Sequence, residues 1–388
     1  MMNWIVRIFI SVLFSLIIMQ FTNSTAKSQA PYFNVSITKD LVSNFDGGIK
    51  TGQAFLGLID LQFNLNPSNM EHWKHSHLRL QLQNTYGQTP TQELVGDVQV
   101  FSNIENGTCT YLHQLWYQYK NNDIAFIIGK HDVNEQYFTS EYGGAYVNSS
   151  FGIMPLVSLN VPVSIFPSTT MGLSGSYRFT DGFKWQAAVY NGYPCDLTDT
   201  NFGLDFDDMR WDEGLFYVSE VHLADLIPGS KGTYKLGSFY HGGEMPVQGN
   251  PGQTQRGAGG AYLIADQQLY TSQQKASKEL GMLFQMGYSP SRTSLNDFYL
   301  AYGFNYSGLM KKGGDELALA VAHASTNNRL ARQNNAYTDA ETVFELTYAF
   351  SPIKNVTIQP NFQYIIHPGM LAGYDNAFVG LLRLSYSR

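Results

Sequence analysis

Residues 342–364 read TVFELTYAFSPIKNVTIQPNFQY, and this stretch decides the fold. In its first nine residues, aromatic and aliphatic side chains alternate with Glu345 and Thr347, and in its last nine they alternate with glutamine and asparagine. Such alternation predicts β-strands with one apolar and one polar face. The short segment 351–355 between them predicts a hairpin turn. Because Pro360 lacks an N–H donor in the middle of the second strand, we expect a bulge there.

The same two-faced pattern recurs along most of the chain. Further segments that show it are 53–64, 77–83, 171–179, 280–288, 298–306 and 378–386. After residue 30 no apolar run is long enough for a membrane helix, so a membrane location requires a closed barrel. The sequence therefore predicts an all-β protein, a transmembrane antiparallel β-barrel with short periplasmic turns. The longer polar stretches 191–213 and 242–257 are expected to be outer loops, one of which folds into the channel.

Composition agrees with this fold class. Charged residues make up 14% of the chain, below the roughly 25% typical of soluble domains, while it contains 25 Tyr, 25 Phe and 36 Gly. A net charge of −7 without a basic run excludes nucleic acid as a partner. That net charge predicts a preference for neutral or cationic solutes.

The first residues indicate export. Arg7 precedes the apolar run 8–19, and small residues follow up to Ala30. This arrangement predicts a signal peptide over residues 1–26, cleaved between 26 and 30, and a single barrel domain over 31–388. The alternative is an anchor helix, but the run is shorter than the roughly 20 residues that cross a bilayer.

No metal or catalytic motif stands out. His72, His75 and His77 lack the helical spacing of a zinc pair, and we interpret them as a loop that enters a strand. The acidic residues between Asp205 and Glu213 lack the calcium-loop glycine and are interpreted as an anionic outer loop. No nucleophile–base arrangement is found. We expect no enzyme activity, no cofactor and no metal.

Two cysteines, Cys109 and Cys195, are too few for a zinc site or a disulfide scaffold. The sequence leaves open whether they pair in an oxidising compartment or lie separately on two loops.

Several segments, taken in order, resemble the carbohydrate-selective porins of the OprB type. They are LVSNFDGG (41–48), GIKTG (48–52), LHQLWYQY (112–119), GKHD (129–132), NSSFG (148–152), ETVFELTY (341–348), IQPNFQYI (358–365) and HPG (367–369). The resemblance implies a barrel of about 16 strands in the outer membrane that passes monosaccharides and other small polar solutes by diffusion. Pro360 belongs to the matching segment. The chain departs from the usual aromatic ending, because it closes on Tyr386-Ser387-Arg388.

The parity of the strands also predicts which side chains line the path of the solute. Candidates on polar faces are Trp116, Arg79, Arg178, Glu341, Glu345 and Arg383. Trp116 would be an aromatic platform for a sugar ring, and the charged groups would replace hydration. The alternative for each is a lumen residue that only satisfies its neighbours.

The expected partners are outer-membrane lipids and small sugars as permeating solutes, with monomer and homotrimer both left open. Other functions compatible with the sequence are a general diffusion porin without sugar selectivity, an outer-membrane β-barrel enzyme and a secreted carbohydrate-binding sandwich.

Overall fold

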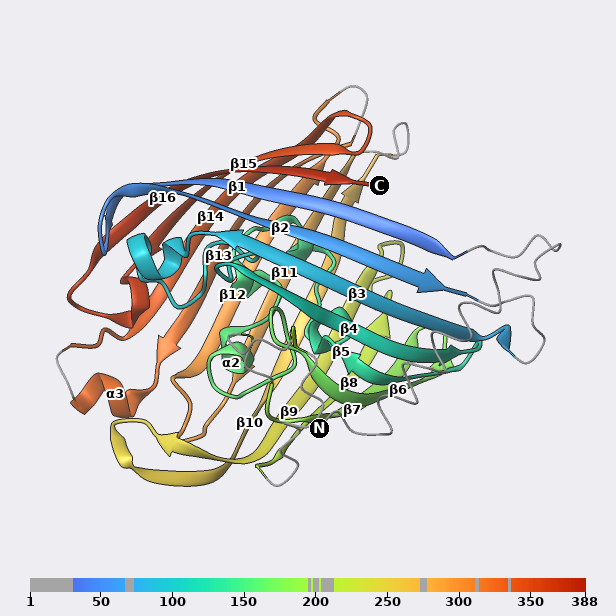
Figure 1. Ribbon diagram of the computed structural model, residues 1–388, viewed down its shortest axis with the longest axis horizontal. Coiled ribbons are helices and arrows are strands. Elements are labelled where there is room, and N and C mark those ends of the chain that lie inside the picture. The colour runs from blue at the N-terminus through green and yellow to red at the C-terminus, as the bar shows by residue number, and fades with distance from the viewer. Residues whose placement is uncertain are drawn as a thin grey trace.

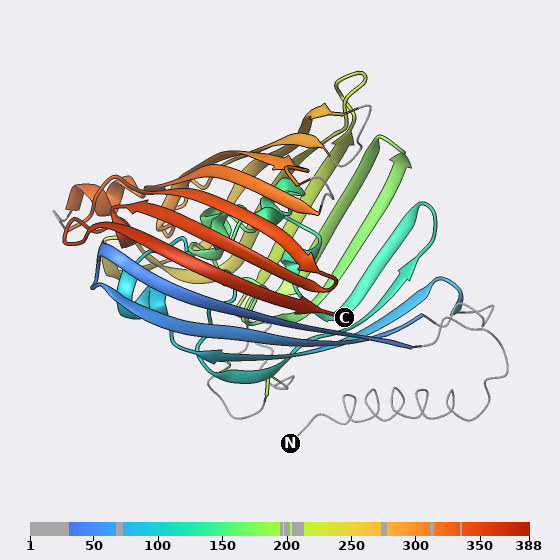
Figure 2. The same ribbon diagram turned by 90° about the horizontal axis from the view of Figure 1, so that it is seen from above.

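The computed structural model describes residues 31–66, 73–194, 197, 202–203, 213–272, 278–310, 314–333 and 336–388. Its strands form one closed antiparallel barrel in which each strand pairs with its neighbours in sequence and β1 pairs with β16 (Figures 1 and 2). Closure removes the free edges that an open sheet would expose. The expected barrel of about 16 strands is confirmed.

The strands are β1 (Tyr32–Gly48), β2 (Gly52–Leu65), β3 (Ser76–Gly87), β4 (Cys109–Lys120), β5 (Ile124–His131), β6 (Thr170–Thr180), β7 (Phe183–Asn191), β8 (Leu215–Ala224), β9 (Gly232–Val247), β10 (Asn250–Thr271), β11 (Glu279–Tyr288), β12 (Asn296–Ser307), β13 (Asp315–Thr326), β14 (Ala340–Ile353), β15 (Val356–Ile366) and β16 (Asp375–Ser387). Two short helices are α2 (Pro155–Ser158) and α3 (Asn328–Gln333). No helix among the described residues is long and apolar enough to cross a membrane.

The alternation predicted from the sequence corresponds to an outer and an inner face. In β14, Phe344 and Leu346 are both 45% exposed on the outside, whereas Glu345 between them is fully buried on the inside. Neighbouring strands repeat this arrangement, with Phe362 outside and Gln363 inside in β15. Apolar side chains exposed all around a closed barrel require lipid as their surroundings.

The two ends of the barrel differ in their connections. The end that holds Tyr32 and Arg388 has tight turns such as 181–182 and 354–355, and we call it the short-turn end. The opposite, long-loop end carries the segments 88–108 and 132–169. In outer-membrane barrels the short turns face the periplasm.

The segment 242–257, expected to be an outer loop, does lie at the long-loop end, but it is a β-hairpin rather than an irregular loop. Most of this segment belongs to the long hairpin of β9 and β10, which turns at residues 248–249. Its end extends past the other strands (Figure 1), so the outward side chains there, Glu244 and Pro246, need not be apolar, and the sequence lacks the pattern of a spanning strand. Most of the other expected loop, 191–213, lies outside the described residues, as do the expected signal segment, His72 and Cys195.

The bulge expected at Pro360 is also absent from that position. Pro360 lies opposite Leu382 of β16 in regular register, and the register shift between β14 and β15 falls nearer the turn, between Phe350 and Ile353. On the other side, no β14 residue between Thr347 and Phe350 pairs with β15. The missing N–H is therefore tolerated by a gap in one ladder.

Candidate functional site

The segment 132–169 does not stay outside but folds into the barrel, where Figures 1 and 2 show α2 between the walls. Along the route, short 3-10 turns at 133–135, 142–145 and 149–151 keep it compact. We call it the inner loop. It lies inside the lumen and thus narrows the channel.

Carboxylates of the wall hold the inner loop by its backbone. Glu345 accepts from the amides of Val147 and Asn148 at 2.7 and 3.0 Å. Glu220 accepts from the amide of Phe138 at 2.7 Å and from the hydroxyl of Tyr262 at 2.6 Å. A loop buried in a barrel has no strand partners for its N–H groups, so it needs acceptors from the wall.

Asp266 makes a similar connection farther along the loop. Its carboxylate accepts from the hydroxyl of Ser140 and from the amides of Glu141 and Tyr142. With Glu220 and Glu345, it gives the loop acceptors on three different strands, β8, β10 and β14.

Part of the wall beneath the inner loop is made of small residues. A Cβ at Gly281 would overlap the ring of Tyr142, and one at Gly287 would overlap Leu156. On β13 four successive inward positions are alanine and at most 4% exposed: Ala318, Ala320, Ala322 and Ala324. The bulky groups of the loop therefore fill space that the wall leaves open, which fixes the loop by close packing.

A second segment, 88–108, also enters the lumen from the long-loop end. Glu341 accepts from the amides of Val98 and Gln99 at 2.9 and 3.0 Å. Burial raises the pKa of Asp97 in this segment to about 7. Burial and the nearby charge of Asp97 raise the pKa of Glu105 to about 8.

Two strands along the same wall, Arg383 of β16 forms a buried ion pair with Asp40 of β1 at 2.8 Å. The same carboxylate accepts from the hydroxyl of Ser102, which belongs to the segment 88–108. Arg383 therefore lies beneath this segment and helps to hold it.

Arg79 and Trp116, both predicted to line the path, lie side by side on β3 and β4. The guanidinium lies 4.9 Å from the centre of the indole ring and makes an ion pair with Glu135 of the inner loop at 3.0 Å. Gln114 donates to the same carboxylate at 2.7 Å. Because Trp116 is only 5% exposed, its ring supports Arg79 rather than presenting an open face.

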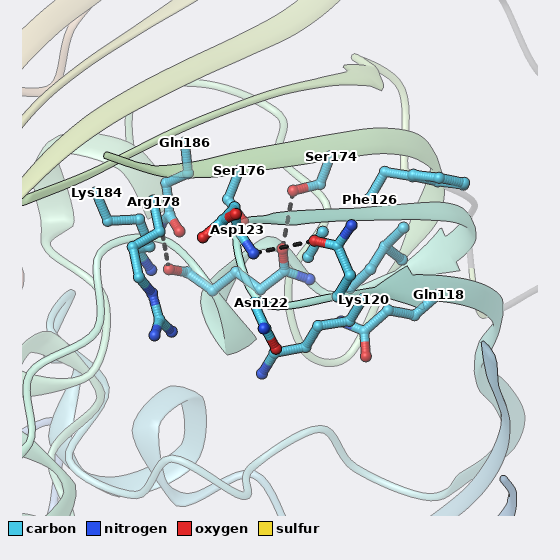
Figure 3. Close-up of a pocket in the computed structure, with 14 residues that line it drawn as sticks. Gln118, Lys120, Asn122, Asp123, Phe126, Ser174, Ser176, Arg178, Lys184 and Gln186 are labelled. Carbon is cyan, nitrogen blue, oxygen red and sulfur yellow. Dashed lines mark hydrogen bonds between the residues drawn. The ribbon is translucent and has the colours of Figure 1, made fainter. Parts of the chain in front are cut away.

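Next to this cluster, a hollow of about 220 Å³ opens between the inner loop and the wall at the short-turn end (Figure 3). Gln136 is the inner-loop residue that lines the hollow. The Ser174 hydroxyl donates to its side-chain oxygen and the Gln186 side-chain amide donates to its backbone oxygen, so its position is fixed. The charged side chains that line the hollow are Lys120, Asp123, Arg178 and Lys184. Its other lining residues include Gln118, Asn122 and Ser176.

The predicted path residues thus separate into two groups. Arg79 and Arg178 lie beside the space that the inner loop leaves open, whereas the other four are at least 90% buried. Trp116 is buried beneath Arg79, and Glu341, Glu345 and Arg383 attach the loops to the wall. Strand parity identified the inward side but could not distinguish these roles. Glu135 and Gln136 were missed because they lie on a loop, where no periodicity marks a lumen position.

Other candidates from the sequence play no part in this geometry. Among the described ranges no group of His, Cys, Asp and Glu is arranged to hold a metal ion. Of the expected acidic outer loop, only Glu213 lies in the described part of the chain. The thiol of Cys109 lies 3.3 Å from the carbonyl oxygen of Leu197, and the pairing question stays open because Cys195 lies outside the described residues.

A closed barrel with an apolar outer belt, a polar inner wall and loops that narrow its lumen defines a channel of the outer-membrane type. Residues 54–387 match the carbohydrate-selective porin, OprB family. This chain belongs to that family, and it is a carbohydrate-selective porin of the outer membrane.

Individual relatives are distant but similar over most of their length. Porin B of Pseudomonas aeruginosa is 22% identical, with 91% of this chain and 86% of that protein covered. The putative porin QuiX of Acinetobacter baylyi is 20% identical, with 92% and 89% covered. The high-pH structure of Pseudomonas putida OprB has a TM-score of 0.82 at 19% identity, covering 92% of this chain and 94% of that one. This likeness confirms the fold.

Proposed function

We propose that small sugars cross this channel by passive diffusion along the wall of β3–β7, between that wall and the inner loop, without any chemical step. The observation that carries the proposal is that the inner loop is fixed to the barrel by wall carboxylates but leaves the hollow beside Gln136 open. A fixed constriction selects solutes by size without needing a conformational cycle.

In this proposal the cluster around Arg79 contacts the solute first. Arg79 and Glu135 have side chains that are 20% and 38% exposed, and together they offer a passing solute both hydrogen-bond donors and acceptors. Such groups can replace the water that a sugar loses on entering a narrow path. Trp116 acts through Arg79, because the indole fixes the guanidinium from below.

The proposal is tested by single-channel recording in planar bilayers, with millimolar glucose added on one side, together with liposome swelling. We expect discrete steps that glucose partly blocks, and an Arg79→Gln variant with several-fold weaker block. Lys354→Gln, which removes one charge in an exposed turn of the same barrel, is the matched control. Steps that no sugar affects would leave a general diffusion porin, and hydrolysis of an added lipid substrate would instead favour an enzyme.

A further inference from the structure

The charges inside the barrel are divided unequally between structural and open positions. The wall carboxylates Glu220, Asp266 and Glu345 are at most 3% exposed and accept hydrogen bonds from the inner loop. They are thus covered by the loop that they hold. The negative net charge of the chain therefore does not describe the surface that a solute meets.

The cations at the short-turn end have a different environment. Lys120 and Arg178 are exposed, Lys184 is half-buried, and all three line the hollow shown in Figure 3. Within the described part of the chain, none of them forms an ion pair within 4.0 Å. Asp123 is the single acidic residue among the lining side chains.

Strand register brings like charges face to face at this place. Arg178 of β6 lies directly opposite Lys184 of β7, which in turn lies opposite His222 of β8 and, one strand farther, Lys235 of β9. Like charges opposite each other destabilise a sheet. The far end of this row is satisfied, because His222 bonds to Glu220 at 2.7 Å and Lys235 donates to the carbonyl of Thr139.

At the near end of the row, among the described residues, neither Arg178 nor Lys184 forms an ion pair, and Asp123 is the one acidic side chain that lines the hollow. Arg178 and Lys184 would both gain from an anion placed in the hollow, and Lys120 lines its adjoining side. A guanidinium fork and ammonium groups are the side chains that bind carboxylates and phosphates best. The amide and hydroxyl side chains of Gln118, Asn122 and Ser176 supply partners for hydroxyl groups.

We propose that Lys120, Arg178 and Lys184 form a weak subsite at the short-turn end that holds the anionic group of a small polyhydroxylated solute. Carboxylated sugars and sugar phosphates share this chemistry. The inference rests on the proposed path, since it adds a preference for anionic sugars to passive diffusion along the same wall. Because the hollow lies at the periplasmic end, the subsite would draw an anionic sugar through the constriction.

The test compares glucose, gluconate and glucose 6-phosphate in liposome swelling and in single-channel block, in 0.1 M and 1 M KCl. We expect the wild-type channel to favour gluconate, glucose 6-phosphate or both over glucose by about threefold to tenfold at low salt. The preference should shrink at high salt, where the Debye length falls from about 10 to about 3 Å. The favoured anion identifies a carboxylate or a phosphate as the preferred group.

Two double variants separate the subsite from overall charge. Arg178→Gln with Lys184→Gln should abolish the anion preference, so that gluconate and glucose 6-phosphate permeate no faster than glucose in the same variant. Lys231→Gln with Lys354→Gln makes the same change of net charge in exposed turns at the same end and should keep the preference. The reversal potential in a KCl gradient should also lose its anion selectivity in the first pair only.

The outcomes distinguish this inference from the proposed function. Equal permeation of glucose and both anions by the wild-type channel would overturn the subsite and leave sugar diffusion in place. A preference that survives in the Arg178/Lys184 pair, or is lost in the control pair, would also overturn it. A channel that passes none of the three solutes would refute both proposals.

Discussion

Replacement of Glu345 by glutamine should release one short stretch of the inner loop and leave the barrel intact. The Glu345 carboxylate accepts from the amides of Val147 and Asn148, at 2.7 and 3.0 Å, and from the side-chain amide of Asn361 at 2.5 Å. Glutamine keeps the size of the side chain but offers one oxygen in place of two. The amide oxygen of the glutamine satisfies the most donors when it accepts from Val147 and Asn361. The amino group then faces the Asn148 N–H, and this buried N–H loses its acceptor.

An unsatisfied buried donor costs about 1–3 kcal/mol. A central value of about 2 kcal/mol corresponds to about a 30-fold change in the equilibrium between the attached and released states. Hydrogen exchange of detergent-purified protein measures this directly, because local opening sets the protection of each amide. We expect exchange of residues 146–149 to accelerate about 30-fold.

Two controls make the result specific. Residues 138–142, which Glu220 and Asp266 hold, should keep their protection in the Glu345→Gln variant. Asp60→Asn is the matched variant, because Asp60 is a buried inward carboxylate that accepts from wall side chains, Gln62 and Gln81. Acceleration below threefold at 146–149, or an equal acceleration spread over the strands, would refute the assigned role of Glu345.

Two further predictions concern packing and pH. Gly287→Ala should weaken the attachment of the inner loop by about 1–3 kcal/mol, and Leu156→Ala by about 2–4 kcal/mol. The double variant should cost less than the sum of the two, because the added methyl group enters the space that Leu156 leaves. A double-mutant cycle measured by hydrogen exchange at residues 153–161 checks this, and strict additivity of the two effects would contradict it. Release of the segment 88–108 would return Asp97 and Glu105 to ordinary pKa values of 3.8 and 4.5, so the attached state, with pKa values of about 7 and 8, binds more protons between those limits. The stability of the attached state should therefore fall as pH rises from about 4 to about 8 and level off above that. Single-channel recordings should show this as more frequent transitions to a larger conductance at higher pH. Asp97→Asn should make the frequency of these transitions less dependent on pH, and a wild-type channel whose transitions do not change with pH would exclude this explanation.

The sequence by itself determined the barrel and, in the strands with regular alternation, the side on which each residue lies. Alternation has a period of two, so Phe344 and Glu345 could be assigned to opposite faces without any knowledge of the neighbouring strands. The lipid location followed from the same pattern together with the low share of charged residues. Pro360 shows the limit of this reasoning, because its tolerance depends on a gap in pairing with β14 that only the neighbouring strand reveals.

Only the tertiary structure decided what fills the lumen. Glu345 and Arg178 have the same inward parity, yet one is fully buried beneath the inner loop and the other borders an open hollow. The difference arises from contacts between Glu345 and Val147, which are 198 positions apart, and from the fit of Leu156 over Gly287. Periodicity describes a residue relative to its own strand, whereas burial by a loop depends on shape and hydrogen-bonding partners across the barrel. The path of the solute is therefore a property of the folded chain.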